Sequence, residues 1–286
     1  MKVGLYYFSA TGNTQLVAEV FRDELVKRGD TVDLIRIEEI LKDGLKVNSD
    51  AYDRIGIGHP VHGFSTPKVV LDLIRAMPKG NGKKVFIFKT AGGPVPINFN
   101  ASKKAIRNLT KKGYDVFYDR IIPIGSNWIS GFRSDVVRQL YQIARRKVKI
   151  SCDEMDEGKT RLMKTGFPLS IMIGVVAFLH DRLTWVLGKD YAVSSACNLC
   201  GKCLRNCPTG NIVVKNGKIR FKLSCLWCMR CIYGCPQNAI HHRLLSFTVL
   251  PSGYDVKKIL ESASAEETGI GRTPPYLQNY IHNDQM

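Results

Sequence analysis

The sequence has few acidic residues and no long apolar run. Its 286 residues include 42 Lys and Arg but only 25 Asp and Glu, which gives a formal net charge of +17 at pH 7. The most apolar stretch, residues 165–179, is shorter than the roughly 20 apolar residues that a transmembrane helix needs. We therefore expect no membrane-spanning helix. A helix over this stretch would pack two parts of the chain together, which we favour, or lie on a membrane surface as a peripheral contact.

Signals for export and for nucleic-acid binding are also missing. The N-terminus has neither the apolar core nor the cleavage site of a signal peptide, so we expect a cytoplasmic protein with reduced thiols. No helix-turn-helix, zinc-finger or RNA-binding signature accompanies the basic charge, and we expect no nucleic acid among its partners. Residues 101–150 hold twelve Lys and Arg against three Asp and no Glu. Such a surface favours an acidic protein partner or an anionic substrate.

Eight of the nine cysteines fall in two runs that share one spacing. Residues 197–208 read CNLCGKCLRNCP and residues 225–236 read CLWCMRCIYGCP, so each run is C-x2-C-x2-C-x3-C-P. Cysteines this close cannot form several compatible disulfides, and zinc sites use paired knuckles or mixed Cys/His sets. Three thiolates two residues apart can wrap one face of a cubane iron–sulfur cluster. The fourth thiolate, held off by three residues and a proline, points towards a second cluster.

The double run resembles the two-cluster bacterial ferredoxins, and we predict two [4Fe-4S] clusters with crossed ligation. The ligands expected for the first cluster are Cys197, Cys200, Cys203 and Cys235. Those expected for the second cluster are Cys225, Cys228, Cys231 and Cys207. Crossing would tie the runs together in a segment too short to build an ordinary core. Residues 212–221 between them predict a hairpin turned at Asn216-Gly217. The ninth cysteine, Cys152, is expected to be an inert thiol.

Residues 1–150 alternate between strand and helix patterns as an α/β domain does. Lys2–Tyr7 predicts a buried strand, and an amphipathic helix is expected from about Gln15 to Lys27. Further strands are expected at 31–37, 54–58, 84–89 and 116–124, and further helices at 65–77, 101–112 and 134–149. Five strands with interposed helices fit a doubly wound parallel sheet of order 2-1-3-4-5. Its ligand site lies at the carboxyl ends of the strands.

A small polar loop, Ser9-Ala10-Thr11-Gly12-Asn13-Thr14, lies between the first strand and the first helix. Its backbone N–H groups, its hydroxyls and the helix N-terminus can all address a phosphate. The loop lacks the glycine spacing of a Walker loop or of a dinucleotide fingerprint. It resembles the FMN-phosphate loop of flavodoxins, usually T-x-T-G-N-T, with Ser9 in place of the first threonine. The resemblance covers residues 1–150 and implies a flavodoxin-like domain that binds FMN.

In flavodoxin-like proteins the loops after the third and fourth strands hold the isoalloxazine ring; here they are residues 59–64 and 90–98. The FMN-binding positions implied by the resemblance are Ser9, Ala10, Thr11, Gly12, Asn13, Thr14, Pro60, Val61, His62, Gly63, Phe64, Thr90, Ala91, Gly92 and Gly93. Phe64, Trp128 or His62 is expected to stack on the ring. His59 and His62 are candidate catalytic proton donors, although a histidine that ends a strand also commonly makes only local hydrogen bonds.

The chain is thus expected to comprise a flavodoxin-like domain at 1–150, a connecting segment with an apolar helix at 151–190, a two-cluster ferredoxin-type domain at 191–243 and a C-terminal extension at 244–286. This order resembles the flavodoxin–ferredoxin fusion family, electron-transfer iron–sulfur flavoproteins typical of anaerobes. The resemblance implies an oxidoreductase that moves electrons between a low-potential one-electron carrier, such as an acidic ferredoxin or flavodoxin, and an acceptor. The alternatives are an FMN-dependent reductase of a small organic substrate and a redox or oxygen sensor.

Overall fold

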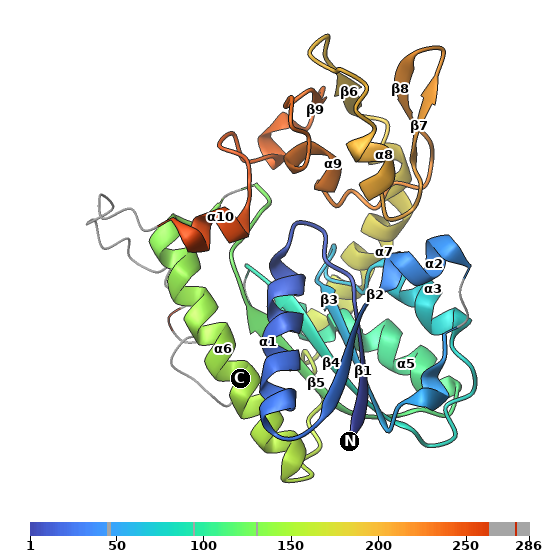
Figure 1. Cartoon of the computed structure of the whole chain (residues 1–286), viewed down its shortest axis with the longest axis vertical. Helices are drawn as coiled ribbons and strands as arrows, with labels where there is room; N and C mark the ends of the chain where they lie inside the picture. The colour runs from blue at the N-terminus through green and yellow to red at the C-terminus, as the bar shows by residue number, and fades with distance from the viewer. Residues whose placement is uncertain (45–46, 94, 130, 263–277, 279–286) are drawn as a thin grey trace.

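The computed structural model describes residues 1–286 except 45–46, 94, 130, 263–277 and 279–286, and a five-stranded sheet forms its N-terminal half (Figure 1). The strand order is β2-β1-β3-β4-β5, and every neighbouring pair is parallel. The strands are β1 (Lys2–Tyr7), β2 (Thr31–Arg36), β3 (Arg54–Pro60), β4 (Lys84–Ala91) and β5 (Asp115–Pro123). This order confirms the predicted doubly wound, flavodoxin-like sheet. Its direction of winding reverses between β1 and β3, where such folds bind ligands.

Helices cover both faces of this sheet. The helices of the whole described chain, including those outside this sheet, are α1 (Asn13–Lys27), α2 (Ile37–Asp43), α3 (Lys68–Ala76), α4 (Val95–Asn98), α5 (Lys103–Lys111), α6 (Ser134–Asp156), α7 (Leu169–Leu187), α8 (Lys202–Asn206), α9 (Arg230–Tyr233) and α10 (Val256–Glu261). Short 3-10 turns lie at Ser49–Ala51, Phe99–Ser102 and Ser246–Thr248. On one face, Phe21 of α1 and Val148 of α6 share a buried cluster. On the other face, Leu73 of α3 and Leu109 of α5 do the same. Burial of each such side chain stabilises the fold by roughly 1.5–3 kcal/mol.

Helix α6 continues to Asp156, past the domain boundary expected at residue 150. Cys152 and Met155 extend its apolar face and are buried in the same cluster as Phe21, so packing carries the helix further than the expected end at Lys149. Burial raises the pKa of the Cys152 thiol to about 12. The thiol is therefore protonated at neutral pH and a poor nucleophile.

The cysteine-rich part forms a small module above the carboxyl edge of the sheet (Figure 1). Strand β6 (Tyr191–Val193) pairs antiparallel with β9 (Ile240–His242), and β7 (Ile212–Lys215) pairs antiparallel with β8 (Lys218–Phe221). Asn216 and Gly217 have φ values of 52° and 66°, so the predicted hairpin turns there in the left-handed conformation that a tight turn needs. The buried residues of the module are few, namely Tyr191, Met229, Ile232 and Ile240. Nine partly buried residues pack around them, and four of the nine are cysteines of the two runs, namely Cys203, Cys225, Cys231 and Cys235.

Helix α7 connects the two parts and has two unlike sides. Ile173 and Ala177 are buried, and His180 packs against Gly63, where an added Cβ would lie 2.1 Å from the imidazole ring. The other side exposes apolar side chains, namely Phe167 just before the helix and then Ile171, Met172, Val175, Val176, Phe178, Leu179, Leu183 and Val186. Among the described residues no helix is both long and apolar enough to cross a membrane. The extension expected at 244–286 is described to residue 262 and at residue 278.

Candidate cofactor-binding site

Four cysteines from the two runs line one small hollow in the module. They are Cys197, Cys200 and Cys203 from the first run and Cys235 from the end of the second. Burial, together with the nearby charges of Cys197 and Cys235, raises the pKa of the Cys203 thiol. The cysteines expected to share the first cluster are therefore neighbours in the fold, although Cys235 lies far along the chain from the other three.

The other four cysteines also influence one another. Burial first, then the charges of Cys228 and Cys207, raise the pKa of Cys225 to about 12. The pKa of Cys231 is likewise raised by burial and by the charges of Cys228, Cys225 and Cys207, with Cys203 of the first run as a further contributor. In the part of the chain that the structure describes, no three His, Cys, Asp or Glu side chains converge as they would on a single metal ion. Cubane ligands bind separate iron atoms and need not converge on one point, so cluster binding stays a prediction here.

The backbone around the cysteines suits bound sulfur. The amides of Trp227, Asn211 and Ala239 donate to the Sγ atoms of Cys225, Cys207 and Cys235 at 3.2, 3.2 and 3.3 Å. Hydrogen bonds of this kind stabilise thiolate ligands and tune cluster potentials. The donor set of eight cysteines with N–H···S bonds fits two iron–sulfur clusters.

The two runs also share a backbone conformation. Leu199 and Trp227, the second residue after the first cysteine of each run, have φ values of 57° and 54°. Gly201 and Met229, which follow the second cysteine of each run, have φ values of 72° and 60°. A left-handed conformation costs a non-glycine residue such as Leu199, Trp227 or Met229 roughly 1–2 kcal/mol. Its repetition at matching positions indicates that the two runs have the same local structure, as two runs that bind the same kind of ligand would.

The loop from Ser9 to Thr14 joins β1 to α1 and fits a phosphate. Gly12 has a φ of 101°, which a side chain would strain. Among the described residues no backbone amide of residues 9–14 donates a hydrogen bond, and the buried Ser9 Oγ has no partner. Buried polar groups normally have partners, and a helix N-terminus with unpaired amides favours an anion. The residues present therefore suit the phosphate of FMN.

Hydrogen bonds bring the three predicted flavin loops to one edge of the sheet. The hydroxyls of Thr14 and Thr90 are 2.8 Å apart, which joins the first loop to the third. The amide of Val61 donates to the carbonyl oxygen of Thr90 at 2.9 Å, which joins the second loop to the third. The His62 ring contacts the Phe8 ring with centroids 6.1 Å apart. Pro94 of the third loop lies outside the described residues.

The three side chains considered for flavin stacking lie in different settings. His62 contacts Phe8, as described. Trp128 is 44% exposed, and its ring lies edge-on to Trp227 of the second cysteine run at 5.7 Å. Phe64 has a φ of 61° in the turn after β3. Trp128 therefore touches the cysteine-rich module.

The two candidate proton donors differ in their contacts. His59 is fully buried, with Nδ1 3.0 Å from the Pro60 carbonyl oxygen and Nε2 3.4 Å from Ser102 Oγ. Burial lowers its pKa to about 4. These contacts are those of a histidine that only completes a strand, the alternative that its sequence position leaves open. Burial and nearby His180 lower the pKa of His62 to about 3, so His62 is neutral at pH 7.

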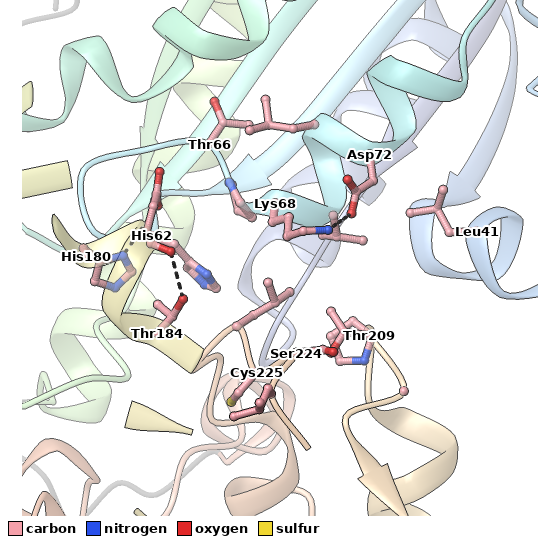
Figure 2. Close-up of a pocket in the computed structure, with 18 of the residues that line it drawn as sticks. Leu41, His62, Thr66, Lys68, Asp72, His180, Thr184, Thr209, Ser224 and Cys225 are labelled. Atoms are coloured by element: carbon pink, nitrogen blue, oxygen red, sulfur yellow. Dashed lines mark hydrogen bonds and ion pairs between the residues drawn. The ribbon is translucent and has the colours of Figure 1, made fainter. Parts of the chain in front are cut away.

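A cavity of about 840 Å³ lies between the sheet domain, α7 and the second cysteine run (Figure 2). His62, Lys68, His180, Thr184 and Cys225 are among its lining residues. Of the residues predicted for cofactor binding, only His62 and Cys225 line it. No pattern in the sequence predicts that α7 lines this cavity, apart from the end of an uncharged stretch at His180.

Comparison with known proteins gives partial likenesses. No protein-family model matches the chain, and no curated protein matches it. A flavodoxin from the domain Archaea is 16% identical over 55% of this chain and 99% of that chain, with a TM-score of 0.37. Flavodoxin 2 from Bacillus cereus is 20% identical over 54% and 99%, with a TM-score of 0.39. An NADH:FMN oxidoreductase in its apo form is 17% identical over 52% and 89%, with a TM-score of 0.36.

The fold of the first half is defined by its own strands and loops. The parallel order β2-β1-β3-β4-β5 with helices on both faces is the flavodoxin-like arrangement. Three loops at one edge of this sheet meet a module that carries eight cysteines in two matching runs.

Proposed function

We propose that this protein transfers electrons through two [4Fe-4S] clusters and FMN. The observation that carries the proposal is the crossed grouping of the cysteines. Cys235 lines the hollow of the first run, and, in addition to burial, the charge of Cys207 acts to raise the pKa of Cys225 and Cys228 in the second run. The second run also touches the sheet domain. Tyr233 Oη donates to the Asn127 carbonyl oxygen at 2.9 Å, beside the contact between Trp227 and Trp128.

In this proposal two sets of residues bind the cofactors. The eight cysteines bind iron, and Ser9 with the amides of residues 9–14 binds the FMN phosphate. When bound, clusters pass single electrons and flavin accepts one or two, which lets the protein convert between single electrons and pairs. The excess of Lys and Arg would attract an acidic carrier such as a ferredoxin or a flavodoxin.

Anaerobic purification followed by iron, sulfide and flavin quantitation tests the proposal. We expect about eight irons, about eight sulfides and one FMN per chain, as the ligand count of two cubanes and one phosphate loop requires. Zinc in place of iron would refute the cluster assignment. A chain that neither contains flavin nor takes it up on addition would refute the FMN assignment, independently of the clusters.

A second candidate function is FMN-dependent reduction of a small organic substrate, and the cavity favours it. A volume of about 840 Å³ lies within the range of small-molecule sites, and Cys225 and His62 place it beside both predicted redox groups. Substituting Thr184→Trp would narrow the cavity. A reductase should then lose turnover of organic acceptors while its reduction by a one-electron carrier continues, and equal loss of both would count against a separate substrate site.

A further inference from the structure

Arg230 contacts elements of both predicted cofactor sites. It lies on α9 between Cys228 and Cys231, two expected ligands of the second cluster. Its side chain is 11% exposed and reaches out of the module to the sheet domain. Nε donates to the carbonyl oxygen of Ala10 at 3.0 Å, and Nη2 donates to that of Ser9. Both carbonyls belong to the predicted FMN-phosphate loop.

The remaining donors of the same guanidinium reach two further segments. Nη1 donates at 2.9 Å to the carbonyl oxygen of Asn206, the residue before Cys207, which is the expected crossed ligand of the second cluster. Nη2 also donates at 2.7 Å to Oε1 of Glu38, a carboxylate that is 3% exposed. The guanidinium carbon lies 5.4 Å from the centroid of the Phe8 ring at the end of β1.

These contacts require an arginine. A guanidinium presents five donors in fixed directions and can satisfy several acceptors at once, whereas a lysine ammonium is a compact charge on a flexible stem. Arg230 therefore fixes the position of the second cysteine run relative to the loop after β1, and it does so from within the run. Its charge also lies beside the ligands, since Arg230 stands between Cys228 and Cys231 in the chain.

We infer that Arg230 is a positioning residue for electron transfer, which fixes the second cluster against the flavin and raises the reduction potential of that cluster. The inference rests on the proposed function. Each event moves one electron: the cluster is oxidised by one, the flavin is reduced by one, and no covalent bond forms or breaks. A nearby cation favours the more negative reduced state of a cluster, so removing it should make reduction harder.

The test compares Arg230→Lys and Arg230→Gln with Arg220→Gln in the full chain. Arg220 is an exposed arginine on β8 of the same module, so its substitution removes the same charge away from the joint. After anaerobic purification, the iron and FMN content, the midpoint potentials of the clusters by EPR-monitored titration and the rate of flavin reduction after flash reduction of the clusters are measured.

We expect Arg230→Gln to lower the potential of the second cluster, and Arg230→Lys to leave it near the wild-type value. Both should slow flavin reduction on the order of tenfold or more, because small displacements of reacting groups are costly. Arg220→Gln should change neither quantity. If Arg230→Gln loses its cofactors, Arg230→Lys decides by the same rate criterion. Wild-type rates and potentials in cofactor-loaded Arg230 variants would overturn the inference and leave the proposed function standing, whereas a wild-type chain without iron or flavin would refute the proposed function itself.

Discussion

At the scale of single residues, the crossed pairing of the cysteines can be tested with Cys207. It is the last cysteine of the first run but is expected to bind the second cluster, since, in addition to burial, its charge acts to raise the pKa of Cys225 and Cys228. We expect Cys207→Ala to damage the second cluster more than the first, with loss of up to about four irons per chain. Iron analysis and EPR of the reduced protein measure this.

The matched control is Cys152→Ala, which removes the one cysteine outside the runs. Cys152 is fully buried in the cluster that α1 and α6 form on the sheet, so its loss should leave the iron content unchanged and cost only some stability. Greater damage to the first cluster in Cys207→Ala would contradict the crossed assignment.

A second residue-scale prediction concerns pH and His59. Burial holds the pKa of His59 at about 4, below the ordinary value of 6.5 that applies to the unfolded chain. Below pH 6.5 the unfolded chain therefore binds a proton that the folded chain does not, and stability falls as the pH falls. The loss approaches about 1.4 kcal/mol per pH unit. Denaturant unfolding at pH 7.5, 6.5 and 5.5 should show a shallower decline in His59→Gln than in wild type. The exposed His241→Gln serves as a control and should decline like wild type.

At the scale of elements, α7 offers two isoleucines with opposite surroundings. Ile173 is 5% exposed and Ile171 is 59% exposed, two residues apart on the same helix. Ile173→Ala should lower the free energy of unfolding by about 2–4 kcal/mol, because it leaves a cavity. Ile171→Ala should change it by less than about 0.5 kcal/mol. Denaturant titrations measure both, and equal effects would show that α7 does not pack on the sheet domain as described.

The elements that the sequence predicted are those with strong local patterns. The apolar runs of β1 and β4 and the turn at Asn216-Gly217 each carry their own signal within a few residues. The end of α6 was missed, because its last turns are fixed by the burial of Cys152 in a distant core. The site shows the same division. The cysteine spacing predicts the cluster ligands. The hydrogen bond from Arg230 to Glu38 joins residues 192 positions apart, and no local sequence pattern predicts it.

At the scale of the whole molecule, net charge should govern the encounter with a redox partner. A chain with a formal charge of +17 attracts an acidic carrier over a distance that salt shortens to about 10 Å at 0.1 M. Raising the ionic strength should therefore slow reduction by an acidic ferredoxin or flavodoxin several-fold. Stopped-flow rates with such a carrier, compared with rates for an uncharged photoreductant, measure the effect. Rates that are equally insensitive to salt would exclude electrostatic docking.

The location of Arg230 also predicts the order in which exposure to air would remove the two kinds of cofactor. In the proposed function, oxidative breakdown of the second cluster would release the short helix α9, and with it the four hydrogen bonds that Arg230 makes to three other segments. The predicted FMN-phosphate loop would therefore lose its hydrogen bonds from Arg230 only after the iron of the second cluster had been lost. Iron loss should come first and flavin loss second, so that the yellow colour of an aerated sample outlasts its brown.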